Sequence, residues 1–426
     1  MRNALSQLRA LLVAAHVVAV LACAFPSPTG GMNRSAWKDP TVQAELNAWA
    51  GRLRVPHDDF EDALWEIATR YMGFREGLLA PFEPYYTHAG TYQAWHMFVA
   101  PHRNPARLHI EIEVEKGQWE TVYISRSPEA DWQAPFLDNA RTRAALFRYS
   151  WRHYRGPFKK LGQAVGAGGG GIPPGASNAD PLVPVHHPHP GAGPNRHGAE
   201  GEVRARDPVQ PGAAPVRLWR RWVALLERQE TGESLAAVRV LMALTVLVVL
   251  LDLSAVIEPL LLDAEQGGYR TFSTPPWLVA ALGGVTPGVV SGLVGACAVS
   301  AGLLLLGVLP RLMALACLQI LIALTSINGH AGGSDDLLLL NALWLLVLSD
   351  SGKTFSLTCR VQTGRWRSDR PVSAWPRYLI IGQLVVMYAT TGLQKVSAHW
   401  VPGGDLGAIY YICLLYTSPS PRDGTK

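Results

Sequence analysis

Apolar segments long enough to cross a membrane dominate the second half of this 426-residue chain. From about residue 216 onward Leu, Val, Ala and Ile predominate, whereas residues 26–215 are mixed and polar. A helix needs about 20 apolar residues to span a bilayer, and its backbone polar groups must bond to one another there. The expected spans are residues 235–257, 287–309, 311–327, 335–349 and 376–395, of which the fourth is short.

The N-terminus is a further candidate span. Arg2 and Arg9 precede an apolar run over residues 11–25, which small and turn-forming residues follow. This pattern is typical either of a cleaved signal peptide or of a retained anchor. We favour a transmembrane anchor over residues 1–25, because no A-x-A cleavage site precedes the polar sequence.

Residues 26–161 read as a small extramembrane α+β domain. Its alternating apolar residues and its Lys116-Gly117 turn predict a short antiparallel sheet, in which Trp119 is expected to be a core residue. The expected elements are two helices within 40–80, strands at 91–99, 107–114 and 118–125, and an arginine-rich helix at 139–154. The predicted fold class is mainly α: a polytopic helical membrane bundle preceded by this domain and by the N-terminal anchor.

Residues 162–215 are rich in Gly, Pro, Ala and His, and this composition predicts a disordered linker. The linker histidines could bind a metal ion, but nothing fixes their geometry, so we favour a flexible tether and expect no metal site. These histidines are His186, His187, His189 and His197.

The formal net charge of +5 is modest, and the basic residues cluster beside apolar segments. Such charge flanks membrane spans and does not indicate nucleic-acid binding. Residues 216–229, with Trp219 and Trp222 among arginines, predict a helix lying at the membrane interface.

Two sets of charged residues give different answers about which side of the membrane residues 26–215 occupy. Basic loops, including the one at 353–370, alternate with acidic ones, which places the basic loops in the cytoplasm and His330 and Lys395 toward the outer face. The same alternation places residues 26–215 inside, whereas Arg2 and Arg9 place them outside. The side of the extramembrane domain therefore stays open.

Two ionisable residues stand where apolar segments meet polar sequence, namely His330 and Lys395. An ionisable group at membrane depth is costly, and it tends to persist where a site or a water-filled cavity uses it. Polar residues inside the apolar runs should likewise face one another or a cavity rather than lipid. They are Gln319, Asn341, Gln383 and Gln394.

Three stretches of the second half resemble the HTTM (horizontally transferred transmembrane) domain, which is shared with vitamin K-dependent γ-glutamyl carboxylase. They are Thr325-Ser-Ile-Asn-Gly-His330 with Asp335-Asp-Leu-Leu-Leu-Leu340, the segment Gly382 to Lys395, and His399-Trp-Val-Pro-Gly403. The likeness covers roughly residues 230–412. In the carboxylase, a lysine at the position matching Lys395 is the base that deprotonates the quinol, and a histidine at the position matching His330 assists it.

The resemblance implies Lys395 and His330 as catalytic residues, with Asn328, Gln394, His399 and Trp400 near the substrate. It implies a quinol of the vitamin K type as cofactor, a lipophilic small molecule and the lipid bilayer as partners, and the inner membrane of a bacterium as location. A desolvated lysine loses the hydration of its charge and can act as a base. The structural alternative is that Lys395 reaches to the interface beside Trp400 while His330 caps a turn.

The chain departs from the carboxylase in two respects. Nothing here corresponds to the large lumenal region that binds substrate and propeptide in the carboxylase. Residues 413–426 resemble translated sequencing-adapter sequence, so we expect the natural chain to continue differently after Ile412. Two hypotheses follow for residues 216–412: a quinol-dependent, carboxylase-like enzyme, or a non-catalytic membrane module that holds a protein partner through the extramembrane domain.

The extramembrane domain has a motif of its own, Gln93-Ala-Trp-His-Met-Phe-Val-Ala-Pro101. This motif is similar to that of an uncharacterised domain of the Trp-x-Met-Phe-x-x-Pro type that accompanies HTTM proteins in bacteria. We find no nucleophile, base and orienting residue together in this domain, so a catalytic role for it is not expected.

Overall fold

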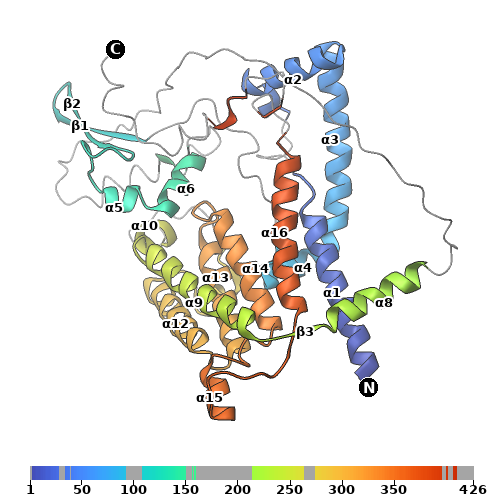
Figure 1. Cartoon of the computed structure of the whole chain (residues 1–426). Helices are drawn as coiled ribbons and strands as arrows, with labels where there is room; N and C mark the ends of the chain where they lie inside the picture. Colours follow the sequence, from blue (N-terminus) through green and yellow to red (C-terminus); the bar gives the residue numbers. More distant parts are fainter. Residues whose placement is uncertain are drawn as a thin grey trace.

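The structure is a computed structural model, and the residues that it describes are mainly helical and include two small antiparallel sheets (Figure 1). It describes residues 2–27, 34–38, 40–92, 108–149, 156, 158–159, 214–262, 274–395, 400–401 and 406–409. Most of the strand expected at 91–99, the four linker histidines, His399 and residues 413–426 lie outside the described residues.

Four helices of the described chain are long and apolar enough to cross a membrane. They are α1 (Arg2–Cys23, spanning over Ala4–Cys23), α9 (Glu233–Ser254), α12 (Pro287–Leu306) and α13 (Pro310–Ile327). The first agrees with the expected anchor, and the others agree with three of the expected spans.

The remaining two expected spans form helices that are not among these four. Helix α14 (Ser334–Leu348) has 15 residues and is short, as its sequence predicted. Helix α16 (Trp375–Leu393) has 19 residues, but Arg377, Gln383 and its threonines make it less apolar than the others. Both helices contact the rest of the bundle, α14 through α9, α13 and α16.

The helices alternate in direction and so define two ends of the bundle. Strand β3 (Gln229–Glu230) pairs with β4 (Val372–Ser373), which brings the start of α9 beside the start of α16. We call residues 214–232 and 349–374 the basic end. The opposite end, called the His330 end, holds the α13–α14 loop and the last residues of α16 (Figure 1).

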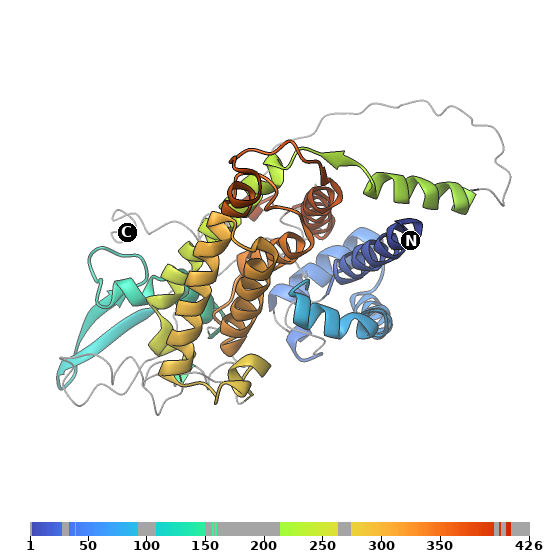
Figure 2. The same cartoon turned by 90° about the horizontal axis from the view of Figure 1, so that it is seen from below.

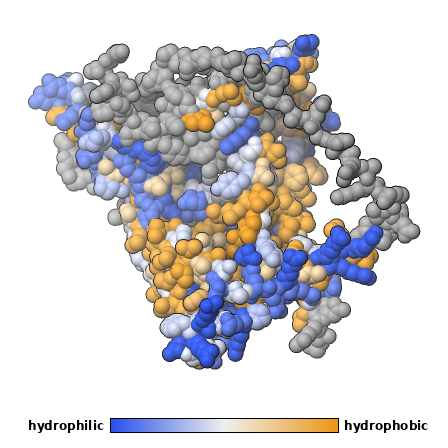
Figure 3. All heavy atoms as spheres, viewed as in Figure 1, coloured by the Kyte–Doolittle hydropathy of each residue, from blue (hydrophilic) through white to orange (hydrophobic). Residues whose placement is uncertain are grey.

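The core lies between α9, α12 and α13, where Leu250, Val290, Leu304, Leu318 and Leu321 are buried. The outward faces of the same helices are also apolar and form part of a broad apolar surface (Figure 3). Exposed members of this surface are Leu241, Val248, Leu251, Val299 and Leu312. An apolar surface of this extent suits contact with lipid better than contact with water.

The N-terminal region contributes more helices than strands. Helices α2 (Pro40–Leu53) and α3 (His57–Leu79) confirm the two helices expected within 40–80, and α4 (Glu83–Ala89) follows them. The short 3-10 helices Ala36–Lys38 and Ala80–Phe82 precede α2 and α4. The Tyr86 hydroxyl donates to the carbonyl of Ala19 at 2.7 Å, so this region packs directly onto α1.

The hairpin consists of β1 (His109–Glu115) and β2 (Gln118–Ile124), which turn at Gly117 with a φ of 87°. It is followed by α5 (Ala134–Leu137) and α6 (Ala140–Tyr149), the latter within the expected arginine-rich helix. The prediction that Trp119 is a core residue is wrong, because its side chain is 47% exposed. Among the described residues this sheet has two strands, and a two-stranded hairpin by itself leaves its side chains largely open to solvent.

The connection between α6 and α8 (Ala214–Leu226) joins opposite ends of the bundle. Helix α6 lies against the His330 end, whereas α8 lies at the basic end, beside the N-terminal part of α1 (Figure 2). The intervening sequence, residues 160–213, contains no apolar run long enough to span a bilayer. Without such a run, the charge alternation places residues 108–149 on the same side of the membrane as α8. The helix arrangement instead places them at the opposite end of the bundle.

Candidate functional site

The α13–α14 loop is held by the side chain of Asn328, the residue that ends α13. Its Nδ2 donates to the carbonyl of Leu260 at 2.8 Å, and its Oδ1 accepts from the backbone N–H of His330 at 3.1 Å. An asparagine that bonds the backbone two residues ahead stabilises a turn, which explains the Asn-x-His spacing physically. Asn328 is 1% exposed, so its observed role is to position His330.

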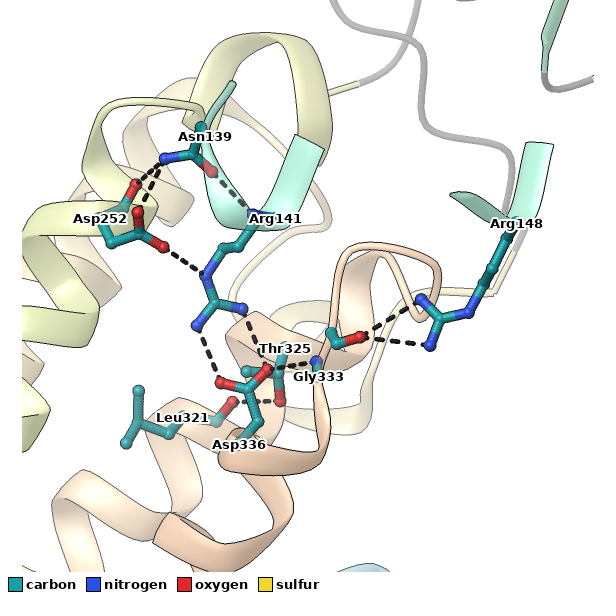
Figure 4. A network of polar contacts seen from close by, with 9 residues as sticks. Asn139, Arg141, Arg148, Asp252, Leu321, Thr325, Gly333 and Asp336 are labelled. Atoms are coloured by element: carbon teal, nitrogen blue, oxygen red, sulfur yellow. Dashed lines mark hydrogen bonds and ion pairs between the residues drawn. The ribbon is translucent and has the colours of Figure 1, made fainter. Parts of the chain in front are cut away.

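His330 is in contact with α6. The imidazole lies edge-on to the ring of Tyr149, with ring centroids 5.5 Å apart. Arg148 donates to the carbonyl of His330. It also donates at 3.2 Å to the carbonyl of Gly332, as Figure 4 shows. Burial lowers the pKa of His330 below its usual 6.5, and the Arg148 charge lowers it further, so the neutral imidazole is favoured. A neutral imidazole has one nitrogen that can accept a proton or a hydrogen bond.

A buried ion pair lies beside this loop. Arg141 on α6 donates to both carboxylate oxygens of Asp336, at 3.1 and 2.8 Å, and lies 3.5 Å from the carboxylate of Asp252 (Figure 4). Asn139 donates to the same Asp252 carboxylate at 2.8 Å. Burial lowers the pKa of Arg141, but hydrogen bonding and attraction from Asp336 outweigh burial and raise it on balance. The arginines of α6 thus attach this helix to the bundle, a role that the sequence analysis did not predict.

Lys395 lies just beyond the end of α16 and is half-buried. Its Nζ is 4.4 Å from the centroid of the Trp400 ring, a cation–π contact. Gln394 donates to the carbonyl of Thr390 in its own helix at 3.2 Å. Lys395 and His330 lie at the same end of the bundle, but in the described part of the chain no hydrogen bond joins them. That they act together stays a prediction.

A hollow of about 540 Å³ lies at the same end of the bundle, between the end of α9, α10 (Ile257–Leu261) and the start of α12. Its volume is in the range of small-molecule sites. Its lining combines two serines with apolar side chains and includes none of the six predicted site residues. The lining residues are Ser254, Ala255, Ile257, Pro259, Leu262, Pro287 and Ser291.

A chain of buried and half-buried polar side chains lies inside the bundle. Trp344 donates to the hydroxyl oxygen of Tyr85 at 2.7 Å, and Nδ1 of His16 lies 2.7 Å from the same oxygen. Nε2 of Gln383 then lies 3.3 Å from both Nε2 of His16 and Oδ1 of Asn341. The expectation that Asn341 and Gln383 face each other is confirmed.

The other two polar residues of the apolar runs behave differently. Gln319 donates to the carbonyl of His88 at 2.7 Å, whereas Gln394 bonds within its own helix. His16 was not among the predicted residues, although a single ionisable residue within an apolar run was the available signal. Tyr85 could not be found in this way, because it lies in the mixed polar region and reaches the bundle only through tertiary packing.

In the described residues no group of three or more His, Cys, Asp or Glu side chains is placed to hold a metal ion. No protein-family model, no curated protein and no solved structure matches this chain. The arrangement itself shows what is available chemically: a neutral imidazole, a buried tyrosine and an arginine-bound loop at one end of a set of membrane-length helices.

Proposed function

We propose that this integral membrane protein is an HTTM-type enzyme that binds a lipophilic quinol at the His330 end and removes a proton from its hydroxyl group. The proton passes from the quinol oxygen to a side-chain nitrogen and leaves a quinolate. Lys395 is the base that accepts the proton, and His330 polarises the hydroxyl or shuttles the proton. Asn328 positions His330, while Gln394, His399 and Trp400 lie near the substrate.

The observation that supports this proposal most is the environment of His330. Its loop is held by Asn328 and Arg148, and its imidazole packs against Tyr149 while its pKa is lowered. A general base should be both positioned and neutral near physiological pH. Lys395, just beyond the end of α16, supplies a second candidate nitrogen. The hollow beside α10 and the adjacent apolar surface offer room for a lipophilic molecule.

Quinol-dependent incorporation of labelled carbon dioxide by the full chain in lipid vesicles tests the proposal. Lys395→Ala and His330→Gln should each lower the rate at least tenfold, because general acid–base groups contribute about 10²–10⁴-fold. Lys353→Ala, an exposed lysine at the basic end, is the matched control and should keep the parent rate. Equal rates for Lys395→Ala and the parent remove this lysine from the chemistry.

A second candidate function is that of a non-catalytic membrane module that presents a partner. The Lys395 contact with Trp400 favours it, since a lysine reaching to the interface makes this kind of contact without any chemistry. The exposed Trp119 and Val114 on the hairpin offer a surface for the partner. A photo-crosslinker at Trp119 of the full chain should then yield one discrete adduct, and the same crosslinker at exposed Ile67 on α3 should not.

A further inference from the structure

The basic end gathers exposed arginines from two segments that are far apart in sequence. Helix α8 and the residue before β3 supply one set, and the segment around α15 (Leu357–Thr363) supplies the other. The pairing of β3 with β4 holds the two segments at the same end (Figures 1 and 2). The exposed arginines are Arg217, Arg220, Arg221, Arg228, Arg360, Arg365, Arg367 and Arg370.

Most of the carboxylates of this end already have cationic partners. Glu230 pairs with Arg377 at 2.8 Å and Glu233 with Arg367 at 2.7 Å. Asp350 pairs with Arg311 at 2.7 Å and with Lys353 at 3.2 Å, and the exposed Glu227 and Asp369 remain. Within the described part of this end, six of these arginines have no carboxylate partner, so the surface keeps an excess of positive charge. These are Arg220, Arg221, Arg228, Arg360, Arg365 and Arg370.

Apolar side chains are exposed among these arginines. Phe355, Val361 and Trp366 are 49%, 83% and 50% exposed. Their segment is well held, because Phe355 donates its N–H to the carbonyl of Trp366 at 2.7 Å and the buried Arg239 donates to the carbonyl of Phe355 at 2.6 Å. Aromatic and cationic side chains together are typical of the headgroup region of a membrane.

Helix α8 turns its arginines toward the surroundings and its tryptophans toward α1. The indole of Trp219 donates to Oε1 of Gln7 at 2.8 Å, and that of Trp222 donates to the carbonyl of Ala10 at 3.1 Å. Both indoles therefore face α1, in contrast to the lipid-facing role that a simple interfacial helix would give them. Arg220 and Arg221 are exposed. Figure 3 shows a hydrophilic strip along α8.

We propose that the basic end is a binding surface for the headgroups of anionic lipids, with Arg220 and Arg221 on one side and Arg365 and Arg370 on the other. The phosphates pair with the guanidinium groups, which suit bidentate phosphate binding. The acyl chains then reach the apolar faces of α9 and α12, while Phe355 and Trp366 lie at headgroup level. Charge complementarity and the exposed apolar side chains together favour a lipid over a soluble anion.

Lipid binding to the delipidated full chain in detergent, measured by native mass spectrometry, tests this proposal. Phosphatidylglycerol should bind more tightly than phosphatidylcholine, and rising salt should weaken only the former. Arg220→Gln/Arg221→Gln should lower phosphatidylglycerol binding about fivefold per arginine, from about 1 kcal/mol for each basic residue near an anionic surface. Arg365→Gln/Arg370→Gln should act in the same direction.

The matched control is Arg52→Gln/Arg54→Gln, which removes two exposed arginines near the end of α2, away from the basic end. It should leave phosphatidylglycerol binding at the parent level. Equal binding of the two lipids by the parent chain, or equal losses in the control and in Arg220→Gln/Arg221→Gln, would overturn the proposal. Displacement of phosphatidylglycerol by millimolar inorganic phosphate would also overturn it, because the surface would then be a site for free anions. The salt response of the parent chain needs no variant and is decisive if a variant misfolds.

Discussion

Arg141 and Asp336 form a bidentate ion pair between α6 and the first turn of α14, and their side chains are 7% and 6% exposed. Residues 195 positions apart are joined in this way. The pair lies beside the loop that carries His330, so the attachment of α6 and the geometry of the candidate site depend on the same contact.

Breaking this pair should destabilise the protein strongly. Asp336→Asn removes the hydrogen-bonded carboxylate of Arg141 and leaves the buried guanidinium with the more distant Asp252 and Asp335, and removing one partner of a buried pair costs about 3–5 kcal/mol. The free energy of unfolding in mixed micelles measures the loss. Asp335→Asn, at the exposed neighbouring position, should change it by less than about 0.5 kcal/mol. Equal effects of the two substitutions would show that the pair does not form.

The buried polar chain should make Tyr85 sensitive to loss of a single oxygen. Tyr85→Phe leaves the indole N–H of Trp344 and the imidazole of His16 without this partner, at a cost of about 1–3 kcal/mol. Tyr388→Phe is the control, because Tyr388 is 73% exposed and should tolerate the change. Thermal unfolding in the same micelles compares them, and similar unfolding temperatures would contradict the polar chain.

Gly307 should not accept a side chain. It ends α12 with a φ of 71°, and an added Cβ would lie 2.3 Å from the Cβ of Ser356. Gly307→Ala should cost about 1–3 kcal/mol for overpacking, in addition to the backbone strain. Gly364→Ala tests strain alone, since Gly364 has the same φ of 71° and open space around its Cβ direction. The difference between the two unfolding free energies isolates the contact with Ser356.

His330 should make stability depend on pH in a defined direction. Its folded pKa is lowered, so the unfolded chain binds the proton more readily. Stability from this residue should therefore be constant above about pH 6.5 and fall as the pH decreases toward the folded pKa. Unfolding temperatures of the parent and of His330→Gln between pH 5 and 8 should converge at low pH. A pH-independent difference between the two would contradict the shift.

The α6 contact also predicts sidedness. Because Arg141 and Arg148 bind the α14 start and the α13–α14 loop, the hairpin tip must share a side of the membrane with Ser334. A cysteine at exposed Lys116 should react with an impermeant maleimide from the same side as one at Ser334, and from the side opposite to one at Gln362. Labelling of Lys116→Cys together with Gln362→Cys would instead support the charge alternation.

Most of the membrane helices could be predicted from the sequence, because each depends on a local property. A long apolar run must be helical in lipid, so α9, α12 and α13 began and ended close to their expected limits. The hairpin could also be predicted from a local property, namely the alternation of apolar and polar residues on both sides of Gly117. Trp119 was mispredicted because burial depends on which other element covers a strand, and local sequence does not contain that information.

The candidate site was predictable only in part. A turn at His330 was predicted only as the structural alternative, and the structure shows that the Asn328 side chain bonds the backbone N–H of His330. The arginines of α6 read as an amphipathic face, and only packing shows that Arg141 and Arg148 bind the bundle. His16 illustrates the same limit, since its partner Tyr85 lies 69 residues away and Gln383 lies 367 residues away.

By itself the sequence determined which segments become helices, where charge accumulates and which residues are unusual at membrane depth, because these properties depend on neighbours along the chain. Tertiary structure alone decided that α6 closes over the His330 loop, that Asp336 is the partner of Arg141, and that α8 turns its indoles toward α1. The physical reason is that a buried polar group needs a hydrogen-bond partner nearby in space, and the sequence contains several polar residues that could be that partner. Only the packing of the helices determines which of these residues lies close enough to bond.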